Sequence, residues 1–221
     1  MNDHPPLTQI VLASASPRRL ELLRALGLDV IVAPSGYGEP AVPALSPREL
    51  ASFHAREKLA AALQSLPSPA GMPVVAADTV VDLDGAALGK PRDAAEAAAM
   101  LGMLSGREHL VHTAFALALP GERPWIEESA TTRVRFFALT GGDIADYVAT
   151  GEPLDKAGAY GIQGRAAALV ESIDGDFYTV MGFPLARFIR TLARSGFRLP
   201  TANQNPALNK GIPGVDDLYV P

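Results

Sequence analysis

The 221-residue sequence contains no cysteine, which excludes disulfide bonds, thiolate zinc sites and cysteine nucleophiles. It also lacks an apolar run of the roughly 18 residues that a membrane-spanning helix needs. Residues 1–6 are polar and proline-rich, without the basic and apolar segments typical of a secretion signal. We therefore expect a cytoplasmic protein with no membrane partner.

Positive charge is also scarce. The chain has 19 Lys and Arg against 24 Asp and Glu, a net charge of −5. A protein that binds nucleic acid by neutralising phosphates usually has the opposite balance, so we expect no nucleic-acid partner. Any anionic ligand must be held by a local cluster of Lys and Arg. Hydrophobic residues make up 48% of the chain, which is enough for a sizeable core.

Several common functional motifs are absent. The sequence has no GxxxxGK[ST] phosphate loop, no GxGxxG, no HExxH and no GxSxG. His109 and His112 lie at a predicted strand, where a spacing of three puts them on opposite faces. Ordinary polar positions therefore explain these two histidines better than a metal pair does.

Strand and helix patterns alternate along the chain, which predicts an α/β fold. We expect this fold to form one domain over residues 1–196, with two lobes, followed by a mobile proline-rich tail over 197–221. Predicted strands cover 9–13, 28–33, 110–119 and 131–137; predicted hairpins cover 74–88 around Asp84-Gly85 and 165–178 around Asp174-Gly175; predicted helices cover 16–27, 46–66, 93–105, 140–151 and 184–196.

The first informative motif lies between the first strand and the first helix, where the sequence reads Ser14-Ala15-Ser16-Pro17-Arg18-Arg19. Ser16 is a good N-cap and Pro17 suits the first helical turn, but two arginines in that turn oppose the helix dipole. A bound anion would resolve the conflict, because backbone N–H groups, serine hydroxyls and guanidinium groups together suit phosphate. Alternatively, Arg18 and Arg19 pair with acids elsewhere or reach solvent.

The second motif is Asp78, which interrupts the apolar strand Val74–Val81. A buried carboxylate there needs a metal ion, a cationic partner or a raised pKa. Each of these environments suits a general base or a divalent-metal ligand. The alternative is an edge strand on which Asp78 faces water.

Weaker signals accompany these two. Lys58 lies within the helix predicted over 46–66, and Lys90 follows the hairpin that carries Asp78, so both could face one cleft. Each lysine alone is equally typical of a solvated surface. Glycines at 158, 161 and 164 would allow a ligand to approach the backbone closely, although a structural glycine-rich turn explains them as well.

Taken together, these stretches resemble the Maf family of nucleoside triphosphate pyrophosphatases. The resemblance covers residues 9–195 and follows the family's order: SASPRRLELL, AREK, AADTVV, GKPRD, LSGREHLVHTA, DKAGAYGIQG and GDFYTVMGFP. It implies an α/β fold in which a mixed β-sheet is flanked by helices and two lobes surround a nucleotide cleft. It also implies a homodimer that uses Mg²⁺ or Mn²⁺ to hydrolyse a nucleoside triphosphate to the monophosphate and pyrophosphate.

The resemblance also implies roles for individual residues. Asp78 matches the acid of the ADT motif and would be the base that activates water and a metal ligand. Ser14, Arg19, Lys58 and Lys90 match positions that would bind the triphosphate. Glu39 would assist with metal or water. This chain departs from the family's common PSDIDE, because residues 34–39 read PSGYGE and two acids are replaced by glycine.

The base would be selected by Arg18, Thr79 and Gln163, which match the dTTP/UTP branch of the family. The branch that acts on 7-methyl-GTP tends to have an aromatic residue in place of Arg18 and Glu in place of Gln163. The physical chemistry agrees, because a cationic methylated guanine favours an aromatic face and a carboxylate. A neutral uracil or thymine offers two acceptors around one donor, which suits an amide and a guanidinium.

Three alternatives stay open at this point. The pyrophosphatase could prefer 7-methyl-GTP, or it could remove purine analogues such as ITP. The protein could instead sense nucleotides without turnover, in connection with cell division. A non-catalytic sensor would not require the acid at position 78, so replacing Asp78 with Asn separates it from the enzyme.

Overall fold

The computed structural model describes residues 4–66, 71–121 and 125–201. Seven strands form one mixed sheet in the order β2-β1-β3-β5-β6-β7, with β4 paired to β3. In chain order the elements are β1 (Gln9–Leu12), α1 (Pro17–Ala25), β2 (Asp29–Val32), α2 (Pro47–Ser65), β3 (Val74–Leu83), β4 (Ala86–Leu88), α3 (Ala94–Leu104), β5 (Glu108–Ala118), β6 (Ile126–Phe136), α4 (Gly141–Val148), three 3₁₀ turns η1 (Glu152–Asp155), η2 (Ala157–Ala159) and η3 (Gly164–Ala168), β7 (Val170–Asp174), α5 (Phe177–Met181) and α6 (Leu185–Arg194).

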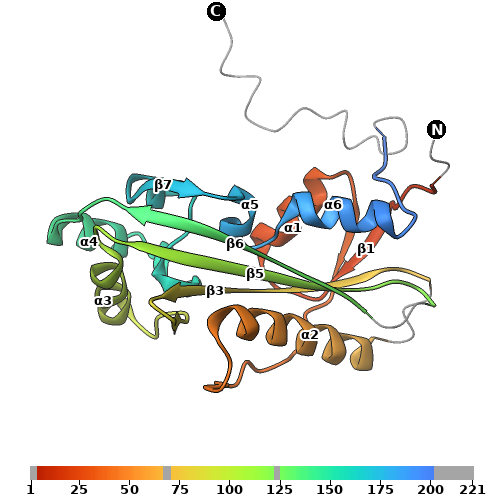
Figure 1. Ribbon diagram of the computed structural model, residues 1–221, viewed down its shortest axis with the longest axis horizontal. Helices are drawn as coiled ribbons and strands as arrows, with labels where there is room; N and C mark the ends of the chain where they lie inside the picture. The colour runs from red at the N-terminus through yellow and green to blue at the C-terminus, as the bar shows by residue number, and fades with distance from the viewer. Residues whose placement is uncertain (1–3, 67–70, 122–124, 202–221) are drawn as a thin grey trace, which may run out of the picture.

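The sheet combines parallel and antiparallel pairing. β1 pairs in parallel with β2 and with the start of β3, and the remaining pairs are antiparallel. Helices α1 and α6 cover one face of the sheet and α2 covers the other, while α3 and α4 lie at the far end (Figure 1). The predicted mixed α/β sheet flanked by helices is confirmed.

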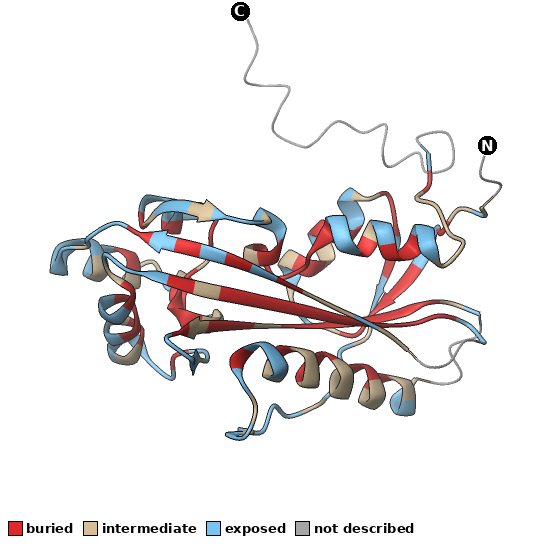
Figure 2. Cartoon of the chain, in the orientation of Figure 1, coloured by how far each residue is buried: buried red, intermediate tan, exposed pale blue. Residues whose placement is uncertain are grey.

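Side chains alternate along β3, so successive residues lie on opposite faces of the sheet. Val75 and Ala77 join the core beneath α1 and α6, whereas Val74, Ala76 and Val80 pack against α2. The central strands are buried along most of their length (Figure 2). Asp78 shares the alternation of Val74, Ala76 and Val80 and therefore faces α2, while Thr79 faces the opposite side.

Helix α2 begins with a capping box, in which Ser46 accepts from the backbone N–H of Glu49 and Glu49 accepts from that of Ser46. Its buried alanine and leucine residues follow helical spacing and pack on the sheet: Ala51, Ala55, Leu59 and Ala62. Lys58 lies next to Leu59 on this inward side, with a side chain only 11% exposed. The fold thus turns this lysine toward Asp78 rather than toward solvent.

The predicted hairpin over 165–178 is wrong. Residues 164–168 form a 3₁₀ turn, β7 pairs with β6, and Phe177–Met181 form helix α5. Asp176 makes the difference, because its carboxylate accepts from the backbone N–H groups of Tyr178 and Thr179 and so caps a helix where a second strand was expected.

The structure also bears on the predicted start of one strand and on the predicted tail. Strand β6 begins at Ile126, five residues before the predicted start. The additional residues include the acids Glu127 and Glu128, and an ion pair with Arg194 accommodates the charge of Glu128 on the sheet. The predicted tail over 197–221 lies outside the described residues from 202 onward. Its first part is docked, since Phe197 and Leu199 pack against the core beneath α6.

Candidate functional site

A cavity of about 740 Å³ opens where β1 ends. β1 pairs with β3 only at Val74 and Val75, and β4 joins the same side of β3 at Val81. Among the described residues, no strand covers the intervening edge of β3. Side chains from both faces of β3 can therefore reach one space, which is why the neighbours Asp78 and Thr79 both line it.

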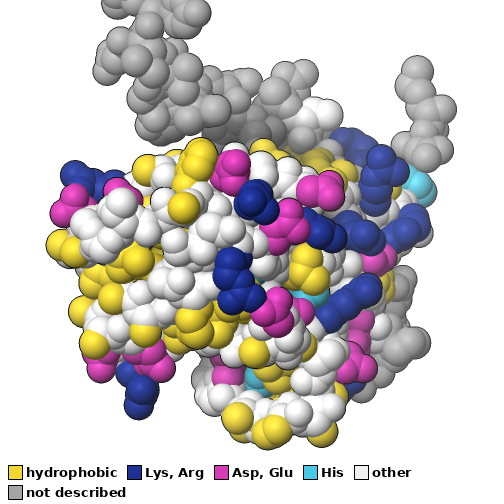
Figure 3. Space-filling model, turned by 60° about the vertical axis from the view of Figure 1, so that its left-hand side comes forward, with side chains coloured by type: hydrophobic (Ala, Val, Ile, Leu, Met, Phe, Trp, Pro, Cys, Tyr) yellow, Lys and Arg dark blue, Asp and Glu magenta, His cyan; other side chains and the backbone are white. Residues whose placement is uncertain are grey.

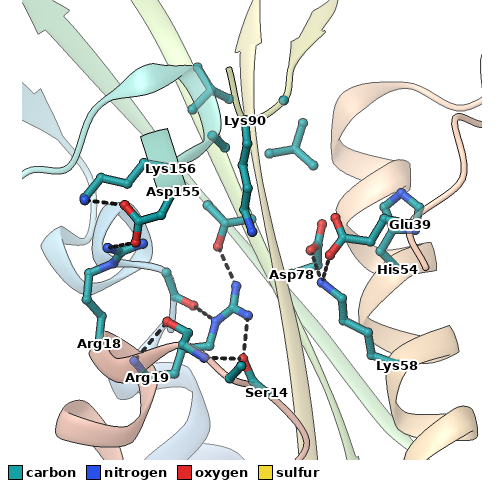
Figure 4. Close-up of a pocket in the computed structure, with 18 of the residues that line it drawn as sticks. Ser14, Arg18, Arg19, Glu39, His54, Lys58, Asp78, Lys90, Asp155 and Lys156 are labelled. Atoms are coloured by element: carbon teal, nitrogen blue, oxygen red, sulfur yellow. Dashed lines mark hydrogen bonds and ion pairs between the residues drawn. The ribbon is translucent and has the colours of Figure 1, made fainter. Parts of the chain in front are cut away.

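All nine residues that the sequence singled out line this cavity: Ser14, Arg18, Arg19, Glu39, Lys58, Asp78, Thr79, Lys90 and Gln163. They come from the β1–α1 loop, α1, the β2–α2 loop, α2, β3, the β4–α3 loop and the turn before η3. Figure 4 labels seven of them, all except Thr79 and Gln163, and shows these seven converging from opposite sides. Basic and acidic side chains lie close together over the face shown in Figure 3.

Asp78, Lys58 and Glu39 form the charged centre of the cavity. The ammonium of Lys58 lies 2.6 Å from Oδ1 of Asp78 and 2.6 Å from Oε1 of Glu39 (Figure 4). Asp78 is 5% exposed and lies on a central strand, so the alternative of a water-facing edge position is excluded. The ammonium of Lys58 compensates the negative charge of the buried Asp78 carboxylate, because a buried charge needs a partner of opposite sign.

The pKa of Glu39 lies below its ordinary value. Partial burial of the carboxyl would raise this pKa, but the hydrogen bond and positive charge of Lys58, with the charges of Lys90 and His54, outweigh it. Glu39 is therefore ionised at neutral pH.

Arg19 is buried and spans the edge of β3. Its guanidinium donates to the carbonyls of Ala77 and Gly182, each at 2.8 Å, and to the hydroxyls of Thr79 at 3.1 Å and Ser14 at 3.3 Å. Burial lowers the pKa of Arg19, and the charge of Asp78 partly opposes this. The backbone N–H of Ala13, just after β1, donates to the carbonyl of Val75 in β3. At the next carbonyl along this edge, that of Ala77, the guanidinium of Arg19 is the donor in place of a strand.

Arg18 is more accessible than Arg19. Its guanidinium lies 3.4 Å from Oδ2 of Asp155, and the ammonium of Lys156 donates to Oδ1 of the same carboxylate at 2.6 Å. Burial would raise the pKa of Asp155, but Lys156 and Arg18 hold it below its ordinary value. The pairing of Arg18 with an acid elsewhere, one of the two sequence interpretations, is thus confirmed for this residue.

Lys90 and Gln163 reach the cavity from exposed loops. The two loops are joined, because the backbone N–H of Gly158 donates to the carbonyl of Gly89 at 3.0 Å. Gly158 has φ +67°, and a Cβ there would lie 2.9 Å from a methyl group of Val81. The close approach at this glycine is therefore to β3, which supports the structural explanation of the glycine-rich segment.

Sequence reasoning missed two residues of the cavity wall, Tyr37 and His54. The hydroxyl of Tyr37 and Nδ1 of His54 are hydrogen-bonded at 3.3 Å. Burial and the nearby carboxylates of Glu57, Glu39 and Asp78 raise the pKa of Tyr37, so its hydroxyl stays protonated. The available signal was spacing, because His54 precedes Lys58 by one helical turn and shares its face of α2.

The carboxylates of Glu39 and Asp78 are the candidate ligands for a divalent cation in this cavity. Among the described residues, no group of three or more His, Asp or Glu side chains could hold a metal. Glu39 and Asp78 nevertheless converge on one cation, Lys58, and Mg²⁺ is commonly bound by one or two carboxylates with substrate phosphates and water. The donor set therefore fits a metal that arrives with a phosphate ligand.

His109 and His112 both lie in β5 on opposite faces, far from forming a metal pair. His109 bonds the hydroxyl of Tyr160, whereas His112 bonds Thr131 and Asp82. Both are buried, at 3% and 4% exposure. Both ring nitrogens of His112 have partners, whereas Nδ1 of His109 is buried without a hydrogen-bond partner among the described residues.

Comparison with known proteins decides the family. The family described as Maf-like protein matches residues 9–195. The chain belongs to this family. The dTTP/UTP pyrophosphatase of Symbiobacterium thermophilum is 50% identical over 195 residues, covering 88% of this chain and 98% of that protein. The dTTP/UTP pyrophosphatase of Thermus thermophilus is 51% identical over 194 residues, covering 88% of this chain and 97% of that protein.

Among solved structures, the Staphylococcus aureus Ham1 protein overlaps 58% of this chain and 72% of its own. The TM-score is 0.41 and the identity 17%, so this partial overlap carries no argument about the site. The Maf resemblance read from the motifs is confirmed by the family match. No helix within the described residues is both long and apolar enough to cross a membrane.

Proposed function

We propose that this Maf-like protein hydrolyses dTTP and UTP to the nucleoside monophosphate and pyrophosphate. The observation that carries the proposal is the buried Asp78, held by Lys58 in a cavity that basic side chains enter from helices α1 and α2 and from the loop that carries Lys90. The identity of about half of all residues with dTTP/UTP pyrophosphatases along almost their whole length supports the same reaction.

In the proposed reaction, a water molecule attacks the α-phosphoryl group in line with the leaving pyrophosphate. Asp78 accepts the proton of this water. Lys58 lies beside it and, with Lys90 and Arg19, offsets the negative charge of the triphosphate, to which the hydroxyl of Ser14 donates.

Mg²⁺ or Mn²⁺ would be held by Glu39 and Asp78. When bound there, such an ion neutralises charge on the phosphate oxygens and polarises them. Lys58 keeps its role beside it, because its ammonium links the two carboxylates.

Recognition of the base is assigned to Arg18, Thr79 and Gln163. The amide of Gln163 can donate to a carbonyl and accept from the imide N–H of uracil or thymine, and Arg18 can donate to the second carbonyl. Thr79 is fixed by hydrogen bonds with Arg19 and Thr113, so its position on the wall is well defined.

Three further properties concern the partners of the protein and its location. The net charge of −5 disfavours contact with nucleic acid. Exposed Ile31 and Val32 on the edge strand β2 offer an apolar surface that suits the expected homodimer. A cytoplasmic location would match the place where nucleoside triphosphates are abundant. Light scattering of the purified protein tests the dimer directly.

A substrate panel tests the proposed function. Pyrophosphate release from dTTP, UTP, CTP, 7-methyl-GTP and ITP is measured with Mg²⁺ or Mn²⁺, for the natural protein and for Gln163→Glu. We expect dTTP and UTP to lead, and Gln163→Glu to lower kcat/KM for both by at least about tenfold, because a carboxylate cannot donate to the base. Preference for 7-methyl-GTP or ITP would overturn the base assignment. Nucleotide binding without turnover would favour the sensing protein.

A further inference from the structure

The loop that carries Glu39 has little regular structure to hold it. Residues 33–46, all of which the structure describes, form neither helix nor strand. Gly36 adopts φ +66° with open space where a Cβ would stand, and the space at Gly38 is open as well. The backbone on both sides of Tyr37 is therefore not fixed by packing, although Glu39 must reach the charged centre of the cavity.

Two side chains of the loop dock on consecutive turns of α2. Tyr37 bonds His54 through its hydroxyl at 3.3 Å, and the two rings lie 5.9 Å apart at an angle of 53°. Glu39 bonds Lys58 at 2.6 Å. Because His54 and Lys58 are four residues apart, they share one face of the helix. Tyr37 and Glu39 are themselves only two residues apart, so fixing Tyr37 restricts where Glu39 can go.

His54 is a firm anchor for this contact. The residue is buried, at 5% exposure, and its ring packs edge-to-face with the ring of Phe53, with 5.6 Å between the ring centroids. Glu39, by contrast, is 45% exposed and belongs to a loop without regular structure. A buried residue on a helix that orients a partly exposed carboxylate ligand is the arrangement expected around a metal site.

We propose that Tyr37 and His54 are positioning residues, which hold Glu39 beside Asp78 so that both carboxylates can bind a divalent cation. This inference rests on the proposed function, in which Glu39 is a metal ligand. Tyr37 and His54 act through Glu39 and do not touch the metal or the reacting phosphate. Substituting Tyr37 or His54 should therefore no longer change the affinity for the cation when Glu39 cannot act as a charged ligand.

A double-mutant cycle tests the inference without depending on turnover. The affinity for Mn²⁺ is measured from the electron paramagnetic resonance of the free ion, with the α,β-methylene analogue of dTTP present. The proteins are the natural chain, Tyr37→Phe, Glu39→Gln and the double variant. We expect Tyr37→Phe to weaken Mn²⁺ binding about tenfold in the natural chain and less than about twofold in the Glu39→Gln background.

Substitutions at His54 give a second, independent test. His54→Asn keeps a hydrogen-bonding group near the position of Nδ1 and should retain Mn²⁺ affinity within about threefold, whereas His54→Leu should weaken it about as much as Tyr37→Phe does. Tyr178→Phe removes a hydroxyl from an exposed tyrosine outside the cavity and serves as the matched control. Thermal melting of each variant shows whether it is folded.

The inference is overturned if Tyr37→Phe leaves Mn²⁺ affinity unchanged, or weakens it equally with and without Glu39. An unchanged affinity in His54→Leu would overturn it too. Turnover of dTTP by the same natural preparation reports separately on the proposed function, so a failure of either proposal is recognised by its own readout.

Discussion

Arg19 shows at the scale of one residue how the cavity is built into the fold. Its guanidinium bonds two backbone carbonyls and two hydroxyls, and it lies at an edge of β3 that β1 no longer covers. The side chain therefore closes the sheet edge and lines the cavity at once. A buried cation with these partners contributes to stability as well as to the electrostatics of the site.

Replacing Arg19 with Lys should destabilise the protein. A lysine ammonium cannot reproduce the planar arrangement of donors, so carbonyls at Ala77 and Gly182 lose their partner. We expect the free energy of unfolding in urea to fall by about 2–4 kcal/mol. Arg18→Lys is the control and should cost less than about 1 kcal/mol, since Arg18 makes one long surface ion pair. Equal effects of the two substitutions would contradict this view of Arg19.

The buried His109 makes stability depend on pH. Burial lowers the pKa of His109 from 6.5 to about 4. Between these values the unfolded chain binds a proton that the folded chain does not, so the free energy of unfolding decreases as pH falls from about 6.5 toward 4. This contribution is complete above pH 6.5. At pH 5 the expected loss from this residue is about 2 kcal/mol.

Urea unfolding at pH 8 and pH 5 checks this expectation. His109→Gln removes the titrating group, so the difference in unfolding free energy between the two pH values should shrink by about 2 kcal/mol in the variant. A variant with the same pH dependence as the natural protein would show that His109 does not carry the effect.

At the same scale, the sequence located some site residues and missed others for a physical reason. Asp78 could be found because an acid within an apolar strand conflicts with its own local pattern. Arg18 and Arg19 could be found because they oppose the helix dipole. Tyr37 and His54 do not conflict with their local sequence patterns, and their contact depends on how an irregular loop crosses α2. Local patterns do not encode that crossing.

At the scale of elements, the η2 turn is fixed against β3 by Gly158. The glycine combines a left-handed backbone with a close approach to Val81. This contact places the segment that leads to Gln163, and the bond from Gly158 to Gly89 places the loop that carries Lys90. The two loops consequently keep one arrangement relative to the sheet.

Gly158→Ala should cost about 2–3 kcal/mol of unfolding free energy, because it adds a clash with Val81 to the penalty of a left-handed alanine. Gly85→Ala is a matched control, with φ +85° but open space around the added methyl, and should cost only about 1 kcal/mol. Within a Val81→Ala background, the cost of Gly158→Ala should fall to about the same 1 kcal/mol. Urea unfolding measures all three values. An undiminished cost in that background would show that Val81 is not the obstacle.

The errors at this scale share a cause. The Asp174-Gly175 pair is a good hairpin signal by itself, yet Asp176 caps helix α5 immediately after it. The start of β6 was hidden because Glu127 and Glu128 are poor strand formers in isolation. In the folded chain Glu128 is paired with arginines from α6, a contact that only the tertiary structure creates.

At the scale of the whole molecule, strands and helices alternate strongly enough that the fold class followed from the sequence. The shared cavity did not follow from periodicity alone, because it depends on β1 ending before β3 does. The ordered motifs of the family supplied that information, and the structure brings all nine expected residues to one space. The site is thus a property of how the sheet is assembled, with chemistry delivered from several loops.

The reaction of dTTP with Asp78→Asn tests the central claim most directly. Release of dTMP and pyrophosphate is measured beside the equilibrium binding of dTTP, for the natural protein and the variant. Because asparagine retains the shape of the side chain but cannot accept the proton, we predict that kcat falls by at least about a hundredfold. Binding of dTTP should change by less than about tenfold. Turnover that survives the substitution unchanged would contradict the role assigned to Asp78 and, with it, the account of this cavity as a catalytic site.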